Sequence, residues 1–553
     1  MTIGAEAVIK SLEKEGVDLI FGYPGGAVLG LYDALNRCKI RHILTRNEQA
    51  AAHAASGYAR TTGKVGVCMA TSGPGATNLV TGIATAYMDS IPLVAITGQV
   101  PTHLIGRDVF QEVDITGATA PFTKHNYLVK DARELPRIIK EAFHIASTGR
   151  PGPVLIDVPK DIASQEIDFH YPESVELRGY KPNYDGHPLQ ISRALEAIKH
   201  AERPVICAGG GVVSAKAHKE LLELAEKNDI PVVTTLMGIG SIPGDHPLAL
   251  GMLGMHGTYY ANKAVSESDL LISMGARFGD RAIGKPAGFA PKAKVIHIDI
   301  DPAEIGKNIQ AHVPIVGDVR RIVKELIKGV EERRRCEWLD LIKRRKEEHP
   351  LAYDDSDKIK PQYVIQELSR ITRGNCIITT EVGQHQMWTA LYYCFNKPGS
   401  FITSGGLGTM GYGFPAAIGA QMGNPKELVI TISGDGSFQM NLPELATAVE
   451  NKLPIKIIIL NNQSLGLVRQ LQEFYCGKRY SQVNFQISPD FVKIAEGYGV
   501  KGLRVEKKCD VTKALEQAVA AERAFVLDII IDCEENVYPM VLNGSPISEM
   551  IGG

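Results

Sequence analysis

A regular alternation of short apolar runs with segments of helical period most constrains the fold of this chain. Continuous apolar runs of this kind are typical of strands buried on both faces of a parallel sheet, and the helical segments between them supply the crossovers. The sequence therefore predicts an α/β protein whose sheets are mainly parallel and flanked by helices. The predicted strands are Val65–Ala70, Leu93–Thr97, Val154–Val158, Val205–Ala208, Val232–Leu236, Leu270–Met274, Val295–Ile300, Ile377–Thr380, Leu428–Ser433, Ile455–Leu460 and Phe525–Ile531.

Two stretches interrupt the alternation and divide the chain, which at 553 residues is too long for one hydrophobic core. Gln165–Pro188 is rich in Pro, Tyr and Gly and has no helical period. Glu331–Gln362 begins with the charge cluster Glu331 to Arg335, which we interpret as the solvated face of an exposed helix that runs into a linker. We therefore expect three α/β units, at 1–164, 189–330 and 363–553, joined by linkers at 165–188 and 331–362.

The composition excludes several classes of protein. The 60 Lys and Arg residues nearly balance the 62 Asp and Glu residues, so nothing indicates a nucleic-acid partner. The 9 cysteines have no paired metal-binding spacing, which favours a reducing, cytoplasmic location. No apolar stretch approaches the roughly 20 residues that span a bilayer, and Met1–Gly16 does not read as a signal or transit peptide. A soluble enzyme is the expectation.

Two polar motifs follow neighbouring predicted strands of the last unit. Gly434-Asp435-Gly436 closes one run, and Asn461-Asn462 closes the next after 24 intervening residues. That gap suits one helical crossover, which brings the carboxyl ends of two parallel strands side by side, where ligands of open α/β sheets bind. Asp435, Asn462 and the backbone just beyond offer hard oxygen ligands that suit Mg²⁺. The glycines let the backbone approach a diphosphate closely. At this spacing, with both motifs at strand ends, the pair resembles the diphosphate motif of thiamine diphosphate (ThDP) enzymes.

ThDP chemistry also needs a carboxylate against the aminopyrimidine ring, because protonation of that ring favours the imino tautomer whose nitrogen removes the C2 proton. The candidate in the first unit is Glu48, which follows Ile43-Leu44 and opens a helix of small residues. An isolated glutamate there would stabilise the helix dipole. The glycine turn Thr71–Asn78, directly after a predicted strand, is typical of a backbone that opens a pocket, and it favours the catalytic interpretation.

Further motifs occur in order along the whole chain: Tyr23–Gly26, Asn47–Gln49, Thr71–Asn78, Phe110-Gln111, Thr123–Asn126, Gly149–Lys160, Gly383–Trp388 and Gly405–Pro415. With the two motifs above, they resemble the catalytic subunit of acetohydroxyacid synthase (acetolactate synthase). The resemblance implies the three-domain architecture of ThDP enzymes, with a pyrimidine-binding domain at 1–164, a central FAD-binding domain at 189–330, and a diphosphate- and Mg²⁺-binding domain with a C-terminal tail at 363–553.

The resemblance implies a role for each matching residue. Glu48 would activate ThDP, Met410 would be the bulky wedge that bends it, and Asp435, Asn462 and the carbonyl of Ser464 would hold Mg²⁺. The residues implied to bind ThDP are Tyr23, Pro24, Gly25, Glu48, Pro74, Asn78, Val382, Gly383, Gln384, His385, Gly408, Met410, Asp435, Gly436, Ser437, Asn462, Ser464, Leu465, Gly466 and Leu467.

Both substrates of the family are 2-keto acids, so a cation must meet a carboxylate. Arg281 occupies the family's position for this contact, and its planar fork binds a carboxylate through two hydrogen bonds. By the same resemblance Gln111 and Lys160 are further catalytic residues, with Gln111 donating hydrogen bonds near the reacting centre. The residues implied to contact substrate are Gly26, Ala27, Phe110, Arg281 and Leu471.

The middle unit carries glycine-rich turns after its predicted strands, although the full dinucleotide fingerprint Gly-x-Gly-x-x-Gly is absent. The resemblance places FAD there, where it does no net redox work and distinguishes biosynthetic enzymes from flavin-free catabolic acetolactate synthases. The residues implied to bind FAD are Arg150, Gly209, Gly210, Gly211, Thr235, Leu236, Leu253, Gly254, Met255, His256, Gly275, Ala276, Arg277, Asp280, Arg281, Asp299, Ile300, Asp318 and Val319.

Two positions depart from the family's pattern. The family usually has His before the catalytic glutamate, where this chain has Asn47, and we expect only a modest local effect. The family usually has Trp at the position of Leu471, where it packs against the second keto acid and is a main contact of herbicide inhibitors. We therefore expect a weaker preference for 2-ketobutyrate over pyruvate, by about 1–3 kcal/mol at most, and reduced herbicide sensitivity.

The implied reaction decarboxylates pyruvate on ThDP and transfers the hydroxyethyl unit to pyruvate or 2-ketobutyrate. The product is 2-acetolactate or 2-aceto-2-hydroxybutyrate, at the first common step of branched-chain amino acid biosynthesis. Because Glu48 and the metal site belong to different units, the resemblance implies a homodimer or a dimer of dimers, and the sequence leaves a small regulatory subunit open. The tail Asn536–Gly553 is either a lid or a frayed terminus.

Three other functions remain alternatives to this one. A flavin-dependent pyruvate oxidase shares the three-unit plan and both cofactors, but its flavin must cycle, and flavin bleaching with pyruvate and an electron acceptor would support it. A simple ThDP decarboxylase would release aldehyde. A nucleotide-binding protein without catalysis would bind cofactor but show no turnover.

Overall fold

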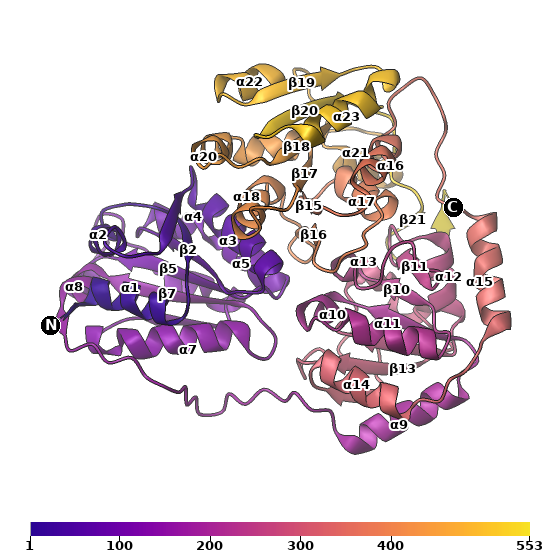
Figure 1. Ribbon diagram of the computed structural model, residues 1–553, viewed down its shortest axis with the longest axis horizontal. Coiled ribbons are helices and arrows are strands. Elements are labelled where there is room, and N and C mark those ends of the chain that lie inside the picture. Colours follow the sequence, from indigo (N-terminus) through magenta and orange to yellow (C-terminus); the bar gives the residue numbers. More distant parts are fainter. Residues whose placement is uncertain (1, 553) are drawn as a thin grey trace.

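The computed structural model describes residues 2–552 and contains three α/β units, each built on a six-stranded sheet (Figure 1). Every pairing within these sheets is parallel, as the sequence predicts. The first sheet has the order β3 (Arg41–Leu44), β2 (Leu19–Tyr23), β4 (Gly66–Ala70), β5 (Leu93–Gln99), β7 (Pro153–Pro159), β6 (His125–Leu128). The central sheet has the order β11 (Ala249–Met252), β10 (Val232–Thr234), β9 (Pro204–Ala208), β12 (Leu270–Met274), β13 (Lys294–Asp299), β14 (Val313–Val316). The third sheet has the order β16 (Phe401–Ile402), β15 (Ile377–Thr380), β17 (Val429–Gly434), β18 (Lys456–Asn461), β20 (Phe525–Ile530), β19 (Lys501–Val505).

Helices flank these sheets because both faces are apolar. In β5, for example, Leu93 and Ala95 pack in one hydrophobic cluster and Val94 and Ile96 in another. The helices of the first unit are α1 (Gly4–Lys14), α2 (Leu29–Leu35), α3 (Glu48–Thr62), α4 (Pro74–Asn78), α5 (Val80–Met88), α6 (Ile115–Thr119), α7 (Leu135–Ser147) and α8 (Lys160–Ser164). Those of the central unit are α9 (Pro188–His200), α10 (Gly210–Ser214), α11 (His218–Lys227), α12 (Tyr259–Glu267), α13 (Asp280–Ile283) and α14 (Val319–Gly329), followed by α15 (Cys336–Glu348). Those of the third unit are α16 (Pro361–Thr372), α17 (Gln384–Tyr392), α18 (Gly413–Gly423), α19 (Asp435–Phe438), α20 (Glu444–Glu450), α21 (Gly466–Tyr475), α22 (Phe491–Gly497) and α23 (Val511–Ala520).

All the predicted strands form, with ends that differ by one or two residues. The strand predicted at Val232–Leu236 is shorter and ends at Thr234, because Leu236–Gly238 turns into a 3₁₀ helix. The stretch 165–188 is largely irregular apart from β8 (Glu166–Ile167), which pairs with β1 (Thr2–Ile3). It runs as an extended connection from the first unit to α9 (Figure 1).

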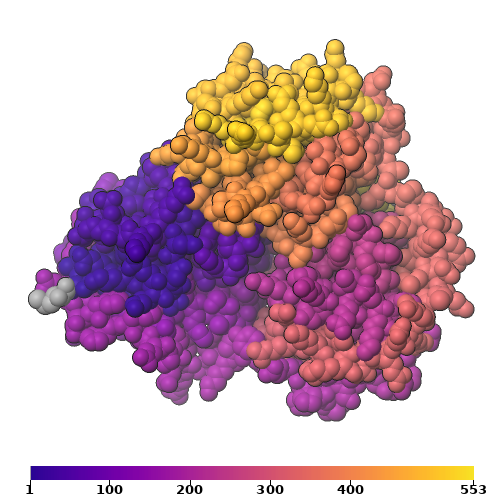
Figure 2. Space-filling model, in the orientation of Figure 1, coloured from indigo at the N-terminus to yellow at the C-terminus, as the bar shows by residue number. Residues whose placement is uncertain are grey.

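The third unit lies across the first and central units (Figure 2), and α18 packs directly on α3 of the first unit. A Cβ atom at Gly57 of α3 would lie 2.1 Å from the carbonyl oxygen of Ala416, and one at Gly419 of α18 would lie 1.8 Å from that of Ala54. Only glycine permits so close an approach of two helices. One hydrophobic cluster therefore continues from the first unit into the third.

The C-terminal tail is docked, so the alternative of a frayed terminus is wrong as far as residue 552. β21 (Met540–Val541) pairs with β22 (Met550–Ile551), and Ile547 is buried in a hydrophobic cluster of the central unit. The Val541 amide donates to the carbonyl of Met255, and the Lys285 amide donates to that of Ser545. The tail thus ties the third unit to the central one.

The charge cluster Glu331 to Arg335 is only partly the solvated face that the sequence suggested. Arg335 is 4% exposed, and its guanidinium donates to the carbonyl oxygens of Asn228, Ile198 and Ala201. The latter two lie at the end of α9, where carbonyls lack helical partners and a cation is favoured. Burial lowers the pKa of Arg335 to about 10. The cluster therefore anchors α15 to the central unit.

We expect Arg335→Ala to destabilise the protein, because several buried carbonyls would lose a charged donor. Hydrogen bonds to charged groups are worth about 1.5–3 kcal/mol each, so a loss of about 2–4 kcal/mol is expected, and the melting temperature should fall by several degrees. Differential scanning calorimetry measures this shift. Arg334→Ala is the control, because that neighbouring side chain is 67% exposed and ion-paired at the surface, and it should change the melting temperature by no more than about one degree. Equal shifts for both variants would contradict the anchoring role.

Candidate active site

The candidate residues of the first unit lie at the carboxyl edge of its sheet. Tyr23 ends β2 and Pro24–Ala27 follow it, Glu48 follows β3, and Pro74–Asn78 follow β4. The Ala27 amide donates to the Thr71 hydroxyl (3.2 Å), so the turns after β2 and β4 are in contact. Lys160 follows β7 at the same edge and is exposed. The topology therefore gathers, on one edge, residues that are far apart in the sequence.

Glu48 is the first residue of α3, and one side-chain hydrogen bond holds its carboxylate. Its Oε2 accepts a hydrogen bond from the side-chain amide of Asn78 (2.9 Å). Asn47 caps the helix, because its side-chain oxygen accepts the Gln49 amide (2.8 Å), and Asn is among the strongest N-cap residues. An asparagine is thus well suited to position 47, where the family pattern has histidine. The carboxylate remains partly exposed and free to meet a ligand.

Phe110 and Gln111 lie in the loop that follows β5. Gln111 adopts a φ of 60°, and a Cβ atom on Gly73 would lie 2.8 Å from its Cα, so this loop touches the turn that leads into α4. Phe110 is 87% exposed, which is unusual for so large an apolar side chain. The loop therefore presents an apolar and an amide side chain beside the edge that carries Glu48.

The third unit contains a pocket at the carboxyl edge of its sheet. It is lined by every third-unit residue predicted to bind ThDP except Gly408, which borders it, because a Cβ atom there would lie 3.9 Å from Val382. Trp388, Gly434, Leu460 and Val468 also line it, although they are not among the residues implied to bind ThDP. No first-unit residue lines the pocket, so this chain alone does not bring Glu48 to it.

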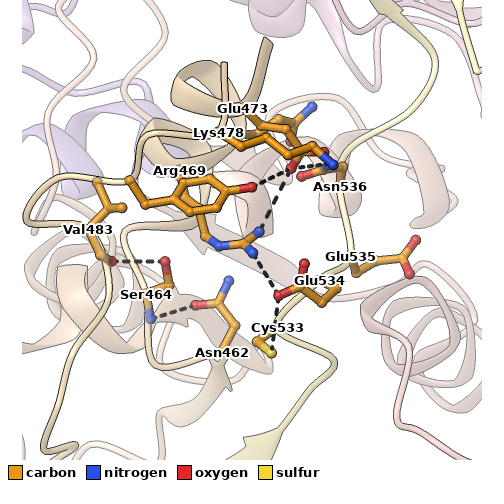
Figure 3. Close-up of polar contacts among 12 residues, drawn as sticks. Asn462, Ser464, Arg469, Glu473, Lys478, Val483, Cys533, Glu534, Glu535 and Asn536 are labelled. Carbon is orange, nitrogen blue, oxygen red and sulfur yellow. Dashed lines mark hydrogen bonds and ion pairs between the residues drawn. The ribbon is translucent and has the colours of Figure 1, made fainter. Parts of the chain in front are cut away.

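Asp435, Asn462 and Ser464 converge in this pocket. Asp435 is 1% exposed, and its Oδ2 has no hydrogen-bond partner among residues 2–552. Burial raises the pKa of this carboxyl to about 7. Asn462 accepts the Ser464 amide (3.2 Å), and Ser464 donates its hydroxyl to the carbonyl of Val483 (2.9 Å), as Figure 3 shows. A buried carboxylate with an unused oxygen beside an amide oxygen suits a hard divalent cation.

Glutamine and histidine side chains shape the rest of the pocket. Gln384 accepts the side-chain amide of Asn462 (3.2 Å) and donates to Gln470 (2.9 Å). A Cβ atom at Gly466 would lie 2.0 Å from Oε1 of Gln384, so a side chain there would displace the Gln384 amide. Burial lowers the pKa of His385 to about 3, which keeps its ring neutral. Asp435 is the one charged side chain among the residues that line the pocket, as suits a ligand that brings its own charge.

The first unit holds the loop that carries Met410. Asp89, at the end of α5, accepts the amides of Gly405 (3.2 Å) and Gly406 (2.7 Å) and pairs with the buried Arg60 (2.5 Å). The hydroxyls of Thr85 and Thr409 lie 2.7 Å apart. The position of Met410 thus depends on contacts with the first unit.

The two remaining substrate candidates, Arg281 and Leu471, lie on different units. Arg281, in α13, is exposed and donates to Asn543 of the tail (2.9 Å). Leu471 lies in α21, partly buried. Also in α21, Arg469 reaches Glu534 (2.6 Å), in the segment that precedes the tail (Figure 3). The tail therefore runs between Arg281 and the helix that carries Leu471.

The predicted FAD residues follow successive strands of the central sheet. They lie after β9, β10, β11, β12, β13 and β14, and therefore at one edge, as a bound dinucleotide requires. Arg150 comes from the first unit and pairs with Asp301 (3.1 Å) and Glu304 (2.8 Å). Burial raises the pKa of Asp299 to about 6.

Sequence reasoning missed one buried acid beside the pocket. Glu381 follows β15, accepts the Gly413 amide (3.0 Å) and lies 3.9 Å from Nε2 of His385. Burial raises its pKa to about 7. A charged residue between an apolar strand and a glycine turn was the signal that could have identified it.

Comparison with known proteins decides the family. Models of the thiamine pyrophosphate enzymes match residues 2–118 (N-terminal TPP binding domain), 191–326 (central domain) and 381–529 (C-terminal TPP binding domain). The chain is 53% identical to a probable acetolactate synthase large subunit of Methanocaldococcus jannaschii, a match that covers 99% of this chain and 95% of the relative. It is 48% identical to the acetolactate synthase isozyme 3 large subunit of Escherichia coli, over 100% of this chain and 98% of the relative. The chain belongs to the acetolactate synthase family. It is therefore a thiamine diphosphate-dependent enzyme of that family, and the resemblance read from its motifs is confirmed.

An acetolactate synthase of Mycobacterium bovis is 50% identical over 99% of this chain and 91% of the relative. In this member of the acetolactate synthase family, residues 2–552 include no helix long and apolar enough to cross a membrane. All nine cysteines are free thiols.

Proposed function

We propose that this chain decarboxylates pyruvate and transfers the resulting two-carbon unit to a second 2-keto acid, either pyruvate or 2-ketobutyrate. The observation that carries the proposal is the third-unit pocket, where the predicted cofactor residues meet around the unpaired Oδ2 of Asp435. When bound, ThDP supplies the electron sink that this decarboxylation requires. Asp435, Asn462 and the Ser464 carbonyl would hold Mg²⁺, and the pocket fits because its single buried carboxylate needs a cation.

The chain's own residues would do the remaining work. Glu48 would give and take the proton at the aminopyrimidine ring, and Met410 would set the conformation of the cofactor. Gln111 and Lys160 would donate to the keto acid, whose carboxylate Arg281 would bind. The docked tail lies beside Arg281 and would help to exclude water, which would otherwise divert the reaction to aldehyde.

We also propose that two copies of the chain complete the site. The pocket is lined by third-unit residues alone, and Glu48 lies on a different unit beside large exposed apolar side chains, Phe110 and Tyr23. The third unit exposes Met440 and Ile487. A second copy that places its first unit on this third unit would cover both surfaces.

Four further features belong to the proposal. FAD would lie along the edge of the central sheet, where the predicted residues follow successive strands. Several relatives are named large subunits, so we infer a smaller regulatory partner. We propose domain limits at 1–164, 189–330 and 363–553. We also propose a cytoplasmic location, with which the free thiols are consistent.

A pyruvate assay with ThDP, Mg²⁺ and FAD each added or withheld tests the function. We expect acetolactate that depends on ThDP and Mg²⁺. Acetaldehyde as the main product would indicate a simple decarboxylase. Acetate with an electron acceptor and flavin bleaching would indicate an oxidase, and cofactor binding without any product would indicate a protein that is not an enzyme.

We predict that Leu471→Trp raises the preference for 2-ketobutyrate over pyruvate. An aromatic side chain discriminates one methylene better than an aliphatic one, and such discrimination is worth about 1–3 kcal/mol, or roughly 10–200-fold. Competition between the two acids, scored as the product ratio, measures it, and inhibition by herbicides should strengthen as well. Leu189→Trp, the same change at an exposed position of the central unit, is the control. A wild-type protein with strong 2-ketobutyrate preference would contradict the prediction.

A further inference from the structure

A buried carboxylate of the third unit holds the turn that precedes Glu48. Glu444, the first residue of α20, is 0% exposed. Its Oε1 accepts the backbone amides of Arg46 (2.7 Å) and Asn47 (3.1 Å), and its Oε2 accepts the hydroxyl of Thr447 (2.6 Å). One acceptor oxygen that takes two successive backbone amides fixes the backbone of this turn. Glu48 follows Asn47 directly in the chain.

The rest of α20 contacts the same segment of the first unit. Thr447 is also 3.2 Å from the carbonyl of Leu44, and the guanidinium of Arg46 pairs with Glu450 (2.8 Å). Arg41 donates to Asn451, which follows the helix (3.1 Å). Figure 1 shows α20 at the side of the third unit that faces the first. The strand-to-helix connection that delivers Glu48 therefore rests on α20, where it contacts Glu444 and Thr447, both of which are fully buried.

Glu48 has its own carboxylate fixed on one side only, by Asn78. The backbone position of Glu48 depends on the turn at Arg46 and Asn47. Without Glu444, the amides of these two residues would hydrogen-bond to water. A displacement of about 1 Å at a reacting group can cost on the order of 100-fold in rate. Loss of the Glu444 contact could therefore displace Glu48 far enough to slow catalysis, although Glu444 itself would touch neither substrate nor cofactor.

We propose that Glu444 is a positioning residue that places Glu48 for its proton transfer, from another unit of the same chain. The proposal rests on the proposed role of Glu48. It requires acceptor oxygens at the right distance, and it does not require the negative charge of Glu444. Geometry and charge can be separated by two substitutions.

Glu444→Gln keeps an acceptor oxygen in place, and its amide group can donate to Thr447 while Thr447 donates to Leu44. We expect this variant to keep kcat within about threefold of the wild type. Glu444→Asp keeps the charge but withdraws the carboxylate by one methylene. We expect its kcat to fall by about 100-fold with the pyruvate KM changed less than threefold. Glu450→Ala, an exposed contact of the same helix with the same Arg46, is the control and should leave kcat unchanged.

A second measurement needs no catalysis. Hydrogen exchange of the cofactor-free chain should be at least tenfold faster over residues 44–50 in Glu444→Asp, and unchanged in Glu444→Gln and in peptides of the sheet cores. If Glu444→Asp does not fold, Thr447→Val loosens the same carboxylate and should accelerate exchange over the same residues. An active Asp variant beside an inactive Gln variant, or unchanged exchange over 44–50, would overturn the proposal. Absence of acetolactate from the wild type would overturn the proposed function instead, and the exchange result would be unaffected.

Discussion

Glu48→Gln should lower acetolactate formation by about 100- to 10,000-fold, the range that a positioned acid or base contributes. The amide has the size of the carboxylate and can still accept the hydrogen bond from Asn78, so the local structure should survive. It cannot supply a proton to the aminopyrimidine ring. Steady-state kinetics should show the loss in kcat, while ThDP affinity and melting temperature stay close to those of the wild type.

Glu6→Gln is the matched control. Glu6 also lies in the first turn of a helix of the same unit, so its replacement removes a similar interaction with the helix dipole far from the proposed site. It should leave kcat unchanged. Full activity of Glu48→Gln would remove the central assignment of the proposed mechanism, and loss of ThDP binding by that variant would show that Glu48 acts in affinity and not in proton transfer.

Asp435→Asn should weaken ThDP binding in the presence of Mg²⁺ by at least about 100-fold. Loss of a residue that merely orients a metal ligand costs 10–100-fold in affinity, and loss of the only carboxylate in the set should cost more. Titration of the cofactor-free protein with ThDP at fixed Mg²⁺, followed by intrinsic fluorescence or calorimetry, measures it. Asp354→Asn, the same change of charge at an exposed linker position, should have no effect.

The same variant should change stability in opposite directions with and without cofactor. Burial raises the pKa of Asp435 from 3.8 to about 7, so the stability of the cofactor-free protein should decline as pH rises from about 4 to 7. At pH 8 the folded chain carries a buried ionised carboxylate, which Asn removes. Asp435→Asn should therefore melt at a higher temperature than the wild type without cofactor and at a lower one with ThDP and Mg²⁺. A lower melting temperature in both conditions would indicate a purely structural role.

The interior strands could be predicted from the sequence and the edge strands could not. β5, β12 and β18 are continuous apolar runs because helices cover both of their faces. An edge strand is partly exposed, so it carries polar residues: β6 reads His-Asn-Tyr-Leu and β19 reads Lys-Gly-Leu-Arg-Val. Its apolar pattern is correspondingly short. The other edge strands are too short to stand out as apolar runs, because β3, β11 and β14 have four residues each and β16 has two. The interior strand β2 was also not predicted, although it is apolar.

The pocket could be predicted because its residues come in short motifs at strand ends. The supporting carboxylates could not, because they act across long separations in sequence. Glu444 meets Arg46, and Asp89 meets Gly405, only after the first and third units have packed together. Read along the chain, each is an ordinary acid at one end of a helix. Arg335 is the same case, since nothing in a run of charges shows which side chain is buried.

The close approach of Gly57 and Gly419 also limits how the chain can be recombined. A hybrid enzyme that takes its first 164 residues from a relative would bring a new surface against α18, and a single added methyl group at either glycine would collide with a carbonyl. Transfer of α18 together with the first unit would preserve the close contact between α3 and α18. Sequence exchange between members of this family should therefore succeed when crossover points keep α3 and α18 from the same parent.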